Sequence, residues 1–247
     1  MADFLVTGTD TGIGKTVIAA ALVKALRAQG VRAIGFKPVE TGLEEGHVAD
    51  SELLARASTE TTSLAVPLLR LTEPLAPAVA AERAGTQVHR QDIEARIDLL
   101  RGAGYVLVVE GAGGAMVPLS WEKGEKNGPG PFFYTVLDLA ERCGFEAVVV
   151  ARAGLGTLNH AAMTVATLRS RNIPVRAVLL NGRDPSSGDL AEATNPAALA
   201  RMLVDVPIVE VPHHPGTDVI DATVPYLRRL LFTLPNQPSD RERSKSR

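Results

Sequence analysis

The segment GTDTGIGKT, residues 8–16, carries the residue types of a phosphate-binding loop. Gly12 and Gly14 allow backbone N–H groups to turn inward on phosphate oxygens. Lys15 supplies a mobile cation, and Thr16 offers a hydroxyl to Mg²⁺. The common pattern G-x-x-x-x-G-K-[ST] has four residues between its glycines, whereas five stand there in this chain. The extra residue lies upstream of the amides that form the cradle, so the segment predicts a nucleotide site. The alternative is a tight strand-to-helix turn with a surface lysine.

Other residues are of the types that bind metal ions and anions. Glu110 ends the apolar run YVLVVE, where a Walker-B-type acid would give Mg²⁺ a hard oxygen ligand. The small residues at 111–114 let the backbone approach a phosphate or a substrate closely. Lys37 precedes Pro38, which favours an extended backbone and projects the lysine from the end of a strand. Asp50 stands at the expected start of a helix.

Each of these residues also has an ordinary structural explanation. Glu110 fits a solvated strand end, Lys37 fits an exposed lysine, and 111–114 fits a flexible glycine-rich loop. Taken alone, Asp50 is favoured as a helix N-cap, because an aspartate at the start of ADSELL is explained by capping. A shared function for these residues therefore depends on the fold that positions them.

Short apolar runs alternate with longer amphipathic segments along the chain. We expect strands at 4–8, 32–38, 105–111, 147–151 and 175–181, and helices at 15–29, 50–57, 88–101, 157–170 and 195–203. Apolar runs without polar alternation are typical of strands covered on both faces. The pattern predicts an α/β fold, a three-layer sandwich with a mostly parallel central sheet, and the glycine loop makes it the P-loop NTPase type.

In such sheets, ligands bind beyond the carboxyl ends of the strands. The segments at the expected strand ends are Thr7–Thr16, Lys37–Gly42, Glu110–Gly114, Ala153–His160 and Asn181–Gly182. All of them carry polar groups or exposed backbone that can do chemistry. We therefore expect one active site where these segments converge.

The chain is long enough to bury one core, with 247 residues of which 45% are hydrophobic. We expect a single domain over residues 1–235. Residues 118–131 are rich in glycine, proline and charge, which indicates a surface loop and a candidate lid. Residues 236–247 are polar and charged without apolar periodicity, so we expect a disordered tail.

Composition argues against several classes of partner. A net charge of -2 and 4% aromatic residues do not fit a nucleic-acid binder, and every apolar run is shorter than the ~18 residues of a membrane span. Cys143 is the only cysteine, and the first residues lack the pattern of a signal peptide, so we expect a cytoplasmic protein. The pair His213 and His214 lacks further ligands at zinc spacing and fits a polar loop.

Four motifs resemble those of the dethiobiotin synthetase family of the biotin pathway: GTDTGIGKT, FKPVETG, VEGAGG and AGLGTLNHA. They stand in order between residue 4 and about residue 182, and the family's loop has the same five-residue spacing. The resemblance implies a homodimer that uses Mg²⁺ and ATP to close a ureido ring on 7,8-diaminopelargonic acid with CO₂. An amine takes up CO₂ as a carbamate, the carbamate attacks the γ-phosphate to give a carbamic–phosphoric anhydride, and the second amine displaces phosphate.

The resemblance also implies roles for individual residues. Catalysis would fall to Lys15, Lys37 and Thr11, and Thr41 would contact the substrate. The substrate's carboxylate end would be held by Gly156, Thr157, Leu158 and Asn159 of the neighbouring subunit, a stretch that also fits a loop capping the next helix. The Mg²⁺ ligands would be Thr16, Asp50 and Glu110. Nucleotide contacts would come from Gly12, Ile13, Gly14, Lys15, Thr16, Val17, Asp50, Glu110, Gly111, Ala112, Gly113, Asn181, Gly182, Pro212, His213 and His214, with Asn181 reading the adenine.

Two other functions share the nucleotide cradle. The first is a related amide-forming ligase or kinase that acts on another carboxylate. The second is a non-catalytic ATP switch that recruits partner proteins, which calls for an apolar surface that changes with the nucleotide. Lys37, Thr41 and the GLGTLNH segment favour the ring-closing enzyme.

Overall fold

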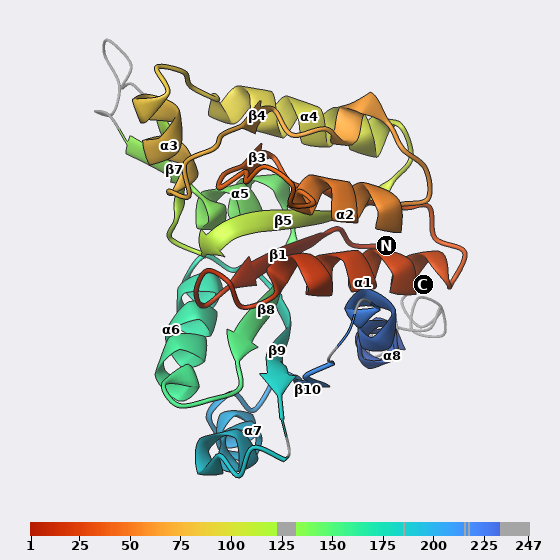
Figure 1. The fold of residues 1–247 in the computed structure, drawn as a ribbon, viewed down its shortest axis with the longest axis vertical. Coiled ribbons are helices and arrows are strands. Elements are labelled where there is room, and N and C mark those ends of the chain that lie inside the picture. Colours follow the sequence, from red (N-terminus) through yellow and green to blue (C-terminus); the bar gives the residue numbers. More distant parts are fainter. Residues whose placement is uncertain (123–131, 185, 215, 217, 233–247) are drawn as a thin grey trace, which may run out of the picture.

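A computed structural model describes residues 1–122, 132–184, 186–214, 216 and 218–232. Within these residues, six strands form a central sheet in which all neighbours run parallel (Figure 1). In spatial order they are β10 (Ile208–Pro212), β9 (Val175–Arg183), β8 (Glu146–Arg152), β1 (Phe4–Gly8), β5 (Val106–Gly114) and β2 (Ala33–Phe36). The mostly parallel sheet expected from the apolar runs is therefore confirmed.

Successive side chains of each strand enter opposite cores, as strand geometry requires. In β1, Val6 belongs to one core cluster and Leu5 to the other. The Val6 face is covered by α1 (Lys15–Arg27), α2 (Asp50–Ala57) and α8 (Val219–Phe232). The Leu5 face is covered by α4 (Arg90–Gly102), α5 (Val136–Cys143), α6 (Thr157–Ser170) and α7 (Leu190–Met202). The three-layer sandwich is thus confirmed, because both sheet faces are buried.

Smaller elements lie outside the central sheet. Strand β3 (Val39–Glu40) pairs in parallel with β4 (Leu69–Arg70), and β6 (Pro118–Glu122) pairs antiparallel with β7 (Phe132–Thr135). Helix α3 (Pro77–Arg83) and a 3₁₀ turn (Ser63–Ala65) complete the elements of the described residues.

The expectation of a surface loop over 118–131 is wrong for its first five residues. They form β6, in which Leu119 and Ser120 are buried, because pairing with β7 holds this segment against α3. Residues 123–131, the rest of the candidate lid, lie outside the described residues, as does the expected tail at 236–247.

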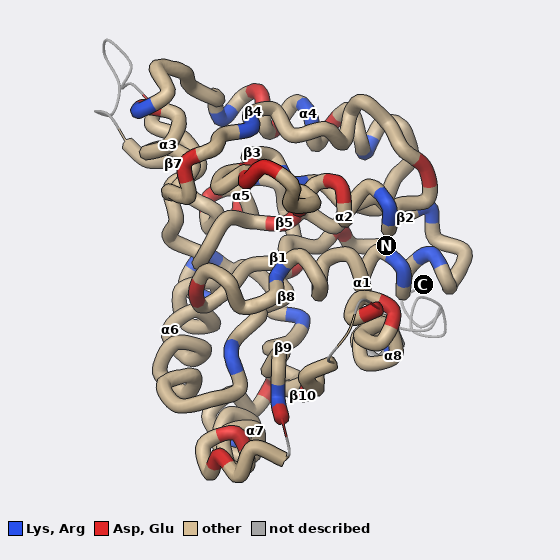
Figure 2. The backbone as a smooth tube through the Cα atoms, viewed as in Figure 1, with Lys and Arg blue, Asp and Glu red and all other residues tan. Residues whose placement is uncertain are grey.

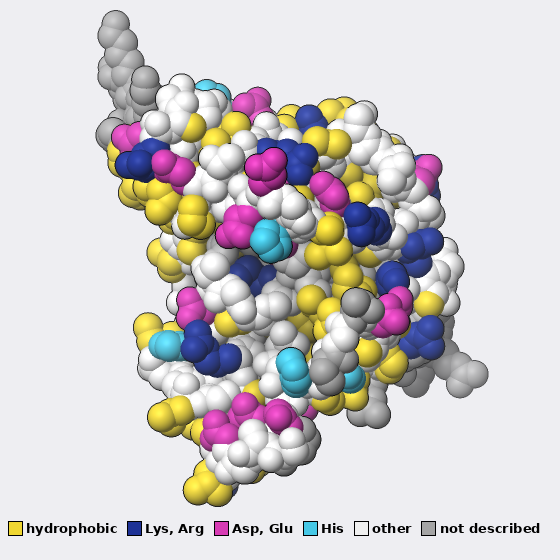
Figure 3. All heavy atoms as spheres, in the orientation of Figure 1, with side chains coloured by type: hydrophobic (Ala, Val, Ile, Leu, Met, Phe, Trp, Pro, Cys, Tyr) yellow, Lys and Arg dark blue, Asp and Glu magenta, His cyan; other side chains and the backbone are white. Residues whose placement is uncertain are grey.

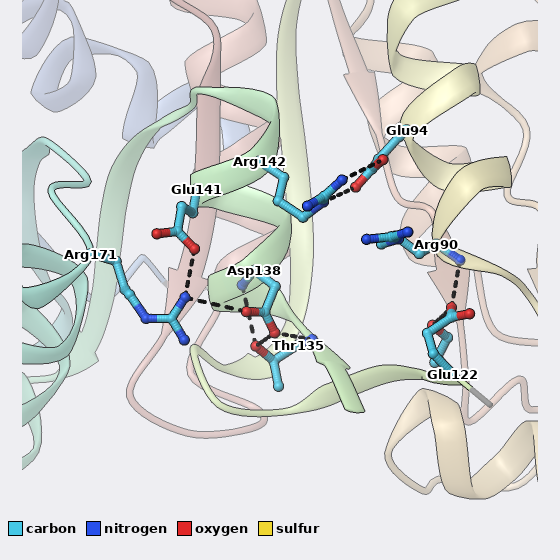
Figure 4. Close-up of polar contacts among 9 residues, drawn as sticks. Arg90, Glu94, Glu122, Thr135, Asp138, Glu141, Arg142 and Arg171 are labelled. Atoms are coloured by element: carbon cyan, nitrogen blue, oxygen red, sulfur yellow. Dashed lines mark hydrogen bonds and ion pairs between the residues drawn. The ribbon is translucent and has the colours of Figure 1, made fainter. Parts of the chain in front are cut away.

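Polar contacts join the helices on the Leu5 face (Figure 4). Helix α5 begins with a capping box, in which the Thr135 hydroxyl accepts from the Asp138 amide at 3.2 Å and the Asp138 carboxylate accepts from the Thr135 amide at 2.9 Å. Arg171, after the end of α6, pairs with Asp138 at 3.6 Å, and Arg142 of α5 donates to Glu94 of α4 at 2.5 Å. These exposed and half-buried pairs fix the neighbouring helices relative to one another.

The amino ends of the strands have their own tie. Asp3, just before β1, accepts from the Leu107 amide of β5 at 2.8 Å and from Arg101 of α4 at 2.7 Å. Elsewhere, Lys and Arg are interspersed with Asp and Glu over the elements (Figure 2). Within the described part of the chain, every helix is too short or too polar to cross a membrane.

Several element boundaries differ from expectation. Helix α7 begins at Leu190 instead of 195, because Asp189 caps it and Pro196 is accommodated inside the helix. Strand β10 and helices α3, α5 and α8 were not expected, and neither were the short strands β3, β4, β6 and β7. The remaining predicted strands and helices are present, with ends that differ by a few residues at most.

Candidate active site

A cavity of about 590 Å³ lies at the carboxyl ends of β1, β2 and β5. In the space-filling view of this face, basic atoms are visible in a recess near its middle (Figure 3). The predicted residues that line the cavity are Thr11, Gly12, Gly14, Lys15, Thr16, Val17, Lys37, Thr41, Asp50, Glu110, Gly111, Ala112 and Gly113. The convergence expected from the strand ends is therefore present for the first three of the five segments.

The loop between β1 and α1 requires glycine at its end. Gly14 has a φ of 87°, in the left-handed region that favours glycine, and a Cβ there would lie 2.2 Å from Nδ2 of Asn181. Asn181, at the end of β9, donates from Nδ2 to the Ile13 carbonyl at 2.9 Å. The side chain of Asn181 therefore holds the phosphate loop.

Lys15, the first residue of α1, is buried beside this loop. Its Nζ donates to the Asp10 carbonyl at 2.9 Å, so the ammonium folds back over the loop. Burial lowers the pKa of this ammonium, and Glu110 opposes that effect. The Asp10 carboxylate accepts from Arg152 of β8 at 2.5 Å, which gives a structural role to an arginine that the sequence left unassigned.

Thr16 and Glu110 connect α1 to the middle of β5. The Thr16 hydroxyl donates to Oε1 of Glu110 at 2.9 Å. Glu110 is 2% exposed, and burial raises the pKa of its carboxyl while Lys37 opposes the shift. Its Oε2 atom is buried and has no hydrogen-bond partner among the described residues. Such an atom costs free energy unless a ligand, a cation or water satisfies it.

Lys37 lies between two acids. Its ammonium pairs with Oδ2 of Asp50 and with Oε1 of Glu110, the latter at 3.2 Å. Burial lowers the pKa of Lys37, but the two carboxylates outweigh burial and the net shift is upward, so the ammonium is held charged. The N-cap reading of Asp50 is wrong, because Ala49 is the N-cap of α2 and Asp50 is the first helical residue, with its side chain turned to Lys37.

The donor set in this cavity suits Mg²⁺. Thr16, Asp50 and Glu110 offer one hydroxyl and two carboxylates, and the Oε2 atom of Glu110 lacks a protein partner. Mg²⁺ takes one or two carboxylates together with water and substrate phosphates. Among the described residues, no group of three or more His, Cys, Asp or Glu side chains has a metal-binding arrangement. Thr16, Asp50 and Glu110 would leave the other coordination positions of Mg²⁺ to water and nucleotide phosphates.

A further set of predicted residues does not line the cavity. Ile13 is buried in the core, and Thr157 to Asn159 form the first turn of α6 after its N-cap Gly156. His213, after β10, donates its amide to the Arg183 carbonyl at 2.7 Å. The residues of the set are Ile13, Gly156, Thr157, Leu158, Asn159, Asn181, Gly182, Pro212, His213 and His214.

One wall of the cavity was missed by sequence reasoning. Residues 74–77 (PLAP) line it together with Val39, Leu53 and Val117, which adds apolar side chains to a cavity that also contains charged residues. The segment reaches this place because the Gly42 amide donates to the Glu73 carbonyl at 3.1 Å, next to the β3–β4 pair. The sequence signal was Pro77, since proline is favoured in the first turn of a helix.

Comparison with solved structures supports the fold. The MinC:MinD cell division protein complex of Aquifex aeolicus has a TM-score of 0.57 and 14% identity, and the match covers 96% of this chain and 99% of that chain. The MinD cell division protein of the same organism has a TM-score of 0.51 and 13% identity, with 96% and 100% covered. At such identities the likeness concerns the P-loop fold alone.

Comparison of sequences gives much closer relatives. Residues 2–232 match the family described as an AAA domain. The ATP-dependent dethiobiotin synthetase BioD of Anaeromyxobacter dehalogenans is 39% identical over 216 residues, which are 87% of this chain and 92% of the relative. The protein of the same name from Thermodesulfovibrio yellowstonii is 35% identical over 216 residues, with 85% and 88% covered. These matches show that the chain belongs to the dethiobiotin synthetase family, within the AAA-domain proteins.

Proposed function

We propose that the protein converts 7,8-diaminopelargonic acid and CO₂ to dethiobiotin, using ATP with Mg²⁺ and releasing ADP and phosphate. The relatives bear the name of this activity. The observation that carries the proposal is a single cavity lined both by the phosphate loop with Lys37 and by the apolar segment 74–77. Such a cavity suits a triphosphate next to an alkyl chain that bears amines.

The charged side of the cavity provides for phosphoryl transfer. The amides of Gly12 and Gly14 and the ammonium of Lys15 would bind the β- and γ-phosphates, and Lys15 would leave the Asp10 carbonyl to do so. Thr16, Asp50 and Glu110 would hold Mg²⁺, which would supply positive charge that neutralises the nucleotide phosphates. Thr11 lies at the same wall and would contact the reacting phosphate.

Ring closure would proceed in three balanced steps. One substrate amine adds to CO₂ and loses a proton, which gives a carbamate. A carbamate oxygen then attacks the γ-phosphorus and the bond to ADP breaks. The second amine attacks the carbamoyl carbon, phosphate leaves with its bonding pair, and the nitrogen loses a proton. Lys37, which is held charged, is a cation available to the carbamate and to the charge that builds on the transferred phosphoryl group.

Oxygen transfer tests this sequence of steps. The purified protein would be incubated with Mg²⁺-ATP, the diamine and ¹⁸O-labelled bicarbonate, and both products would be analysed by mass spectrometry. We expect dethiobiotin together with phosphate that carries ¹⁸O, because the carbamate oxygen is transferred. Lys37→Met would lower the rate by roughly 10²-fold. The control Lys24→Met would not, because Lys24 is a half-buried lysine of α1 that pairs with Asp221 and does not line the cavity. Phosphate formed with another acid, or ATP bound without turnover, would instead favour the ligase, kinase or switch alternatives.

We also propose a cytoplasmic homodimer whose partner subunit completes the substrate site. Leu155, Met116 and Met163 are 88%, 64% and 61% exposed, which is unusual for large apolar side chains unless another surface covers them. Leu155 directly precedes Gly156, the start of the segment that does not line its own cavity. The single cysteine suits the reducing cytoplasm.

Mixing of two inactive variants tests the shared site. Lys15→Ala disables the nucleotide side and Asn159→Ala disables the segment from the partner. Random exchange makes about half of the dimers hybrid, and each hybrid has one intact site, so about a quarter of the activity would return. If residues 156–159 served their own chain's cavity, every site would carry one lesion and the mixture would stay inactive. Light scattering of the unmixed protein would give the oligomeric state independently.

A further inference from the structure

Glu40 is a buried carboxylate behind the candidate active site. It belongs to β3, precedes Thr41, is 2% exposed and does not line the cavity. Its Oε1 atom accepts a hydrogen bond from the Ser51 amide at 3.0 Å, and its Oε2 atom accepts from the Ser51 hydroxyl at 2.7 Å. Arg70 of β4 pairs with Oε2 at 3.4 Å. Both carboxylate oxygens are therefore engaged in fixed directions.

These contacts cap α2 from outside the helix. The N-cap residue, Ala49, has no side-chain oxygen, so the first amides of α2 lack the usual local acceptor. Glu40 supplies that acceptor to the Ser51 amide and places a negative charge at the positive end of the helix. The start of α2 is thus tied to β3, and β3, β4 and α2 lie close together in the fold (Figure 1).

A second tie joins the same two segments on the cavity side. Lys37, which precedes Glu40 by three residues, pairs with Asp50, which precedes Ser51 by one. The contact of Lys37 with Asp50 is available for exchange when a ligand enters, because both side chains line the cavity. The contact of Glu40 with Ser51 lies behind the cavity and does not depend on a ligand. It fixes the backbone that carries Asp50.

A buried carboxylate is a poor choice for stability alone. Burying a charge costs free energy that its partners often do no more than offset, and Arg70 remains 42% exposed. The two hydrogen bonds from Ser51 to Glu40 do, however, fix the backbone next to Asp50. Supporting contacts of this kind, around the residues that bind a metal, tune the affinity for the metal.

We propose that Glu40 is a positioning residue, which sets Asp50 for Mg²⁺ by holding Ser51 at the start of α2. The inference rests on the proposed function, in which Asp50 is a metal ligand. Glu40 itself contacts neither the metal nor the substrate. Its effect is therefore on the affinity for Mg²⁺ with nucleotide and not on nucleotide binding without metal.

The test measures binding of a non-hydrolysable ATP analogue by calorimetry, with Mg²⁺ and with EDTA. The ratio of the two dissociation constants reports the contribution of the metal. We expect Glu40→Ala to reduce this ratio about tenfold and Ser51→Ala, which loses only the hydroxyl contact, to reduce it less, while both leave the metal-free affinity unchanged. Glu40→Gln would restore part of the ratio, since its amide oxygen can accept from the Ser51 amide. Ser51→Ala keeps Glu40 in place, so it tests the inference even if Glu40→Ala does not fold.

Asp3→Asn is the matched control. Asp3 is also a carboxylate that accepts from a backbone amide and pairs with an arginine, but at the amino ends of the strands. It would lower the melting temperature without changing the ratio. The inference would be overturned if Ser51→Ala and Glu40→Ala, or Glu40→Gln where Glu40→Ala does not fold, all left the ratio unchanged. An equal loss of the ratio in Asp3→Asn would overturn it as well. Formation of dethiobiotin by the wild-type protein is scored separately, so a failed inference and a failed function give different results.

Discussion

The hydroxyl of Thr16 and the carboxylate of Glu110 lie 2.9 Å apart, although 94 positions separate them in the chain. The contact joins the first turn of α1 to the middle of β5. Glu110 keeps its other oxygen without a partner among the described residues, so it combines a structural contact with a free coordination position.

Glu110→Gln separates these two properties. The glutamine keeps the shape and can still accept from Thr16, but it removes a charged oxygen ligand. We expect the fold to persist and Mg²⁺-dependent ATP turnover to fall by roughly 10²-fold. Steady-state assays over a range of Mg²⁺ concentrations, with thermal unfolding alongside, check both expectations. Glu122→Gln is the control, since Glu122 is also a buried carboxylate but does not line the cavity. It accepts a hydrogen bond of 2.8 Å from the Arg90 amide (Figure 4). Equal turnover in the two variants would remove Glu110 from the metal site.

Gly14→Ala should abolish nucleotide binding. The new Cβ would meet Nδ2 of Asn181 at 2.2 Å and would sit at a φ of 87°, so the loop must move. The strain alone costs ~1–2 kcal/mol of folding free energy. Gly30 has a similar φ of 76°, and a Cβ added there would have no atom within 4 Å. Gly30→Ala therefore imposes backbone strain without a clash at the nucleotide site. Calorimetry with ATP and denaturant unfolding would show comparable destabilisation in both variants but loss of binding in Gly14→Ala alone. Retained binding in Gly14→Ala would contradict this account of the loop.

Leu75→Asp should weaken binding of the diamine and leave ATP binding intact. Leu75 is 38% exposed and lines the apolar wall, so the change removes apolar contact and adds a charge. A loss of ~1–2 kcal/mol corresponds to a KM increase of about tenfold for the diamine. Val79→Asp is matched in exposure at 40%, but Val79 does not line the cavity. If the KM for the diamine rose equally in both variants, segment 74–77 would not be the substrate wall.

The thiol of Cys143 should react slowly in the folded protein. Burial, with Glu94 nearby, raises its pKa from an ordinary value near 9 to about 11. The thiolate is the reactive form, so alkylation at pH 8 should be about a hundredfold slower than in urea. Because the folded state holds the proton more tightly, the contribution of Cys143 to stability should be constant below pH 9 and decrease as the pH rises towards 11. Mass spectrometry of iodoacetamide labelling and unfolding at several pH values measure the two effects. Equal labelling rates in the folded and unfolded chain would contradict the raised pKa.

Local patterns were sufficient to predict several elements. Helices α2 and α6 begin and end at the expected residues, because each has a clear apolar pattern and a distinct start. The sequence did not indicate β10 or α8, since Pro225 stands inside α8 and proline is ordinarily a sign of a helix boundary. Helix α7 also has a proline inside it, Pro196, and begins five residues before the expected start at 195.

The site was predictable where its residues are neighbours in the chain. The loop from Thr11 to Val17 has a local motif, and Glu110 follows a recognisable buried strand. Segment 74–77 reaches the cavity through β3 and β4, which have two residues each and are too short to show any periodicity. Contacts such as that of Glu40 with Ser51 depend on this long-range pairing, so they could be found only in the folded chain.

In the parallel sheet, the contacts that hold the strands together and the candidate reacting groups lie at opposite ends of the strands. Asp3 secures the strands at one rim, and the candidate reacting groups stand at the other. A library that randomises only the loops at the carboxyl rim therefore leaves the anchoring contacts untouched. Directed evolution towards other diamines can begin from this chain without first rebuilding its scaffold.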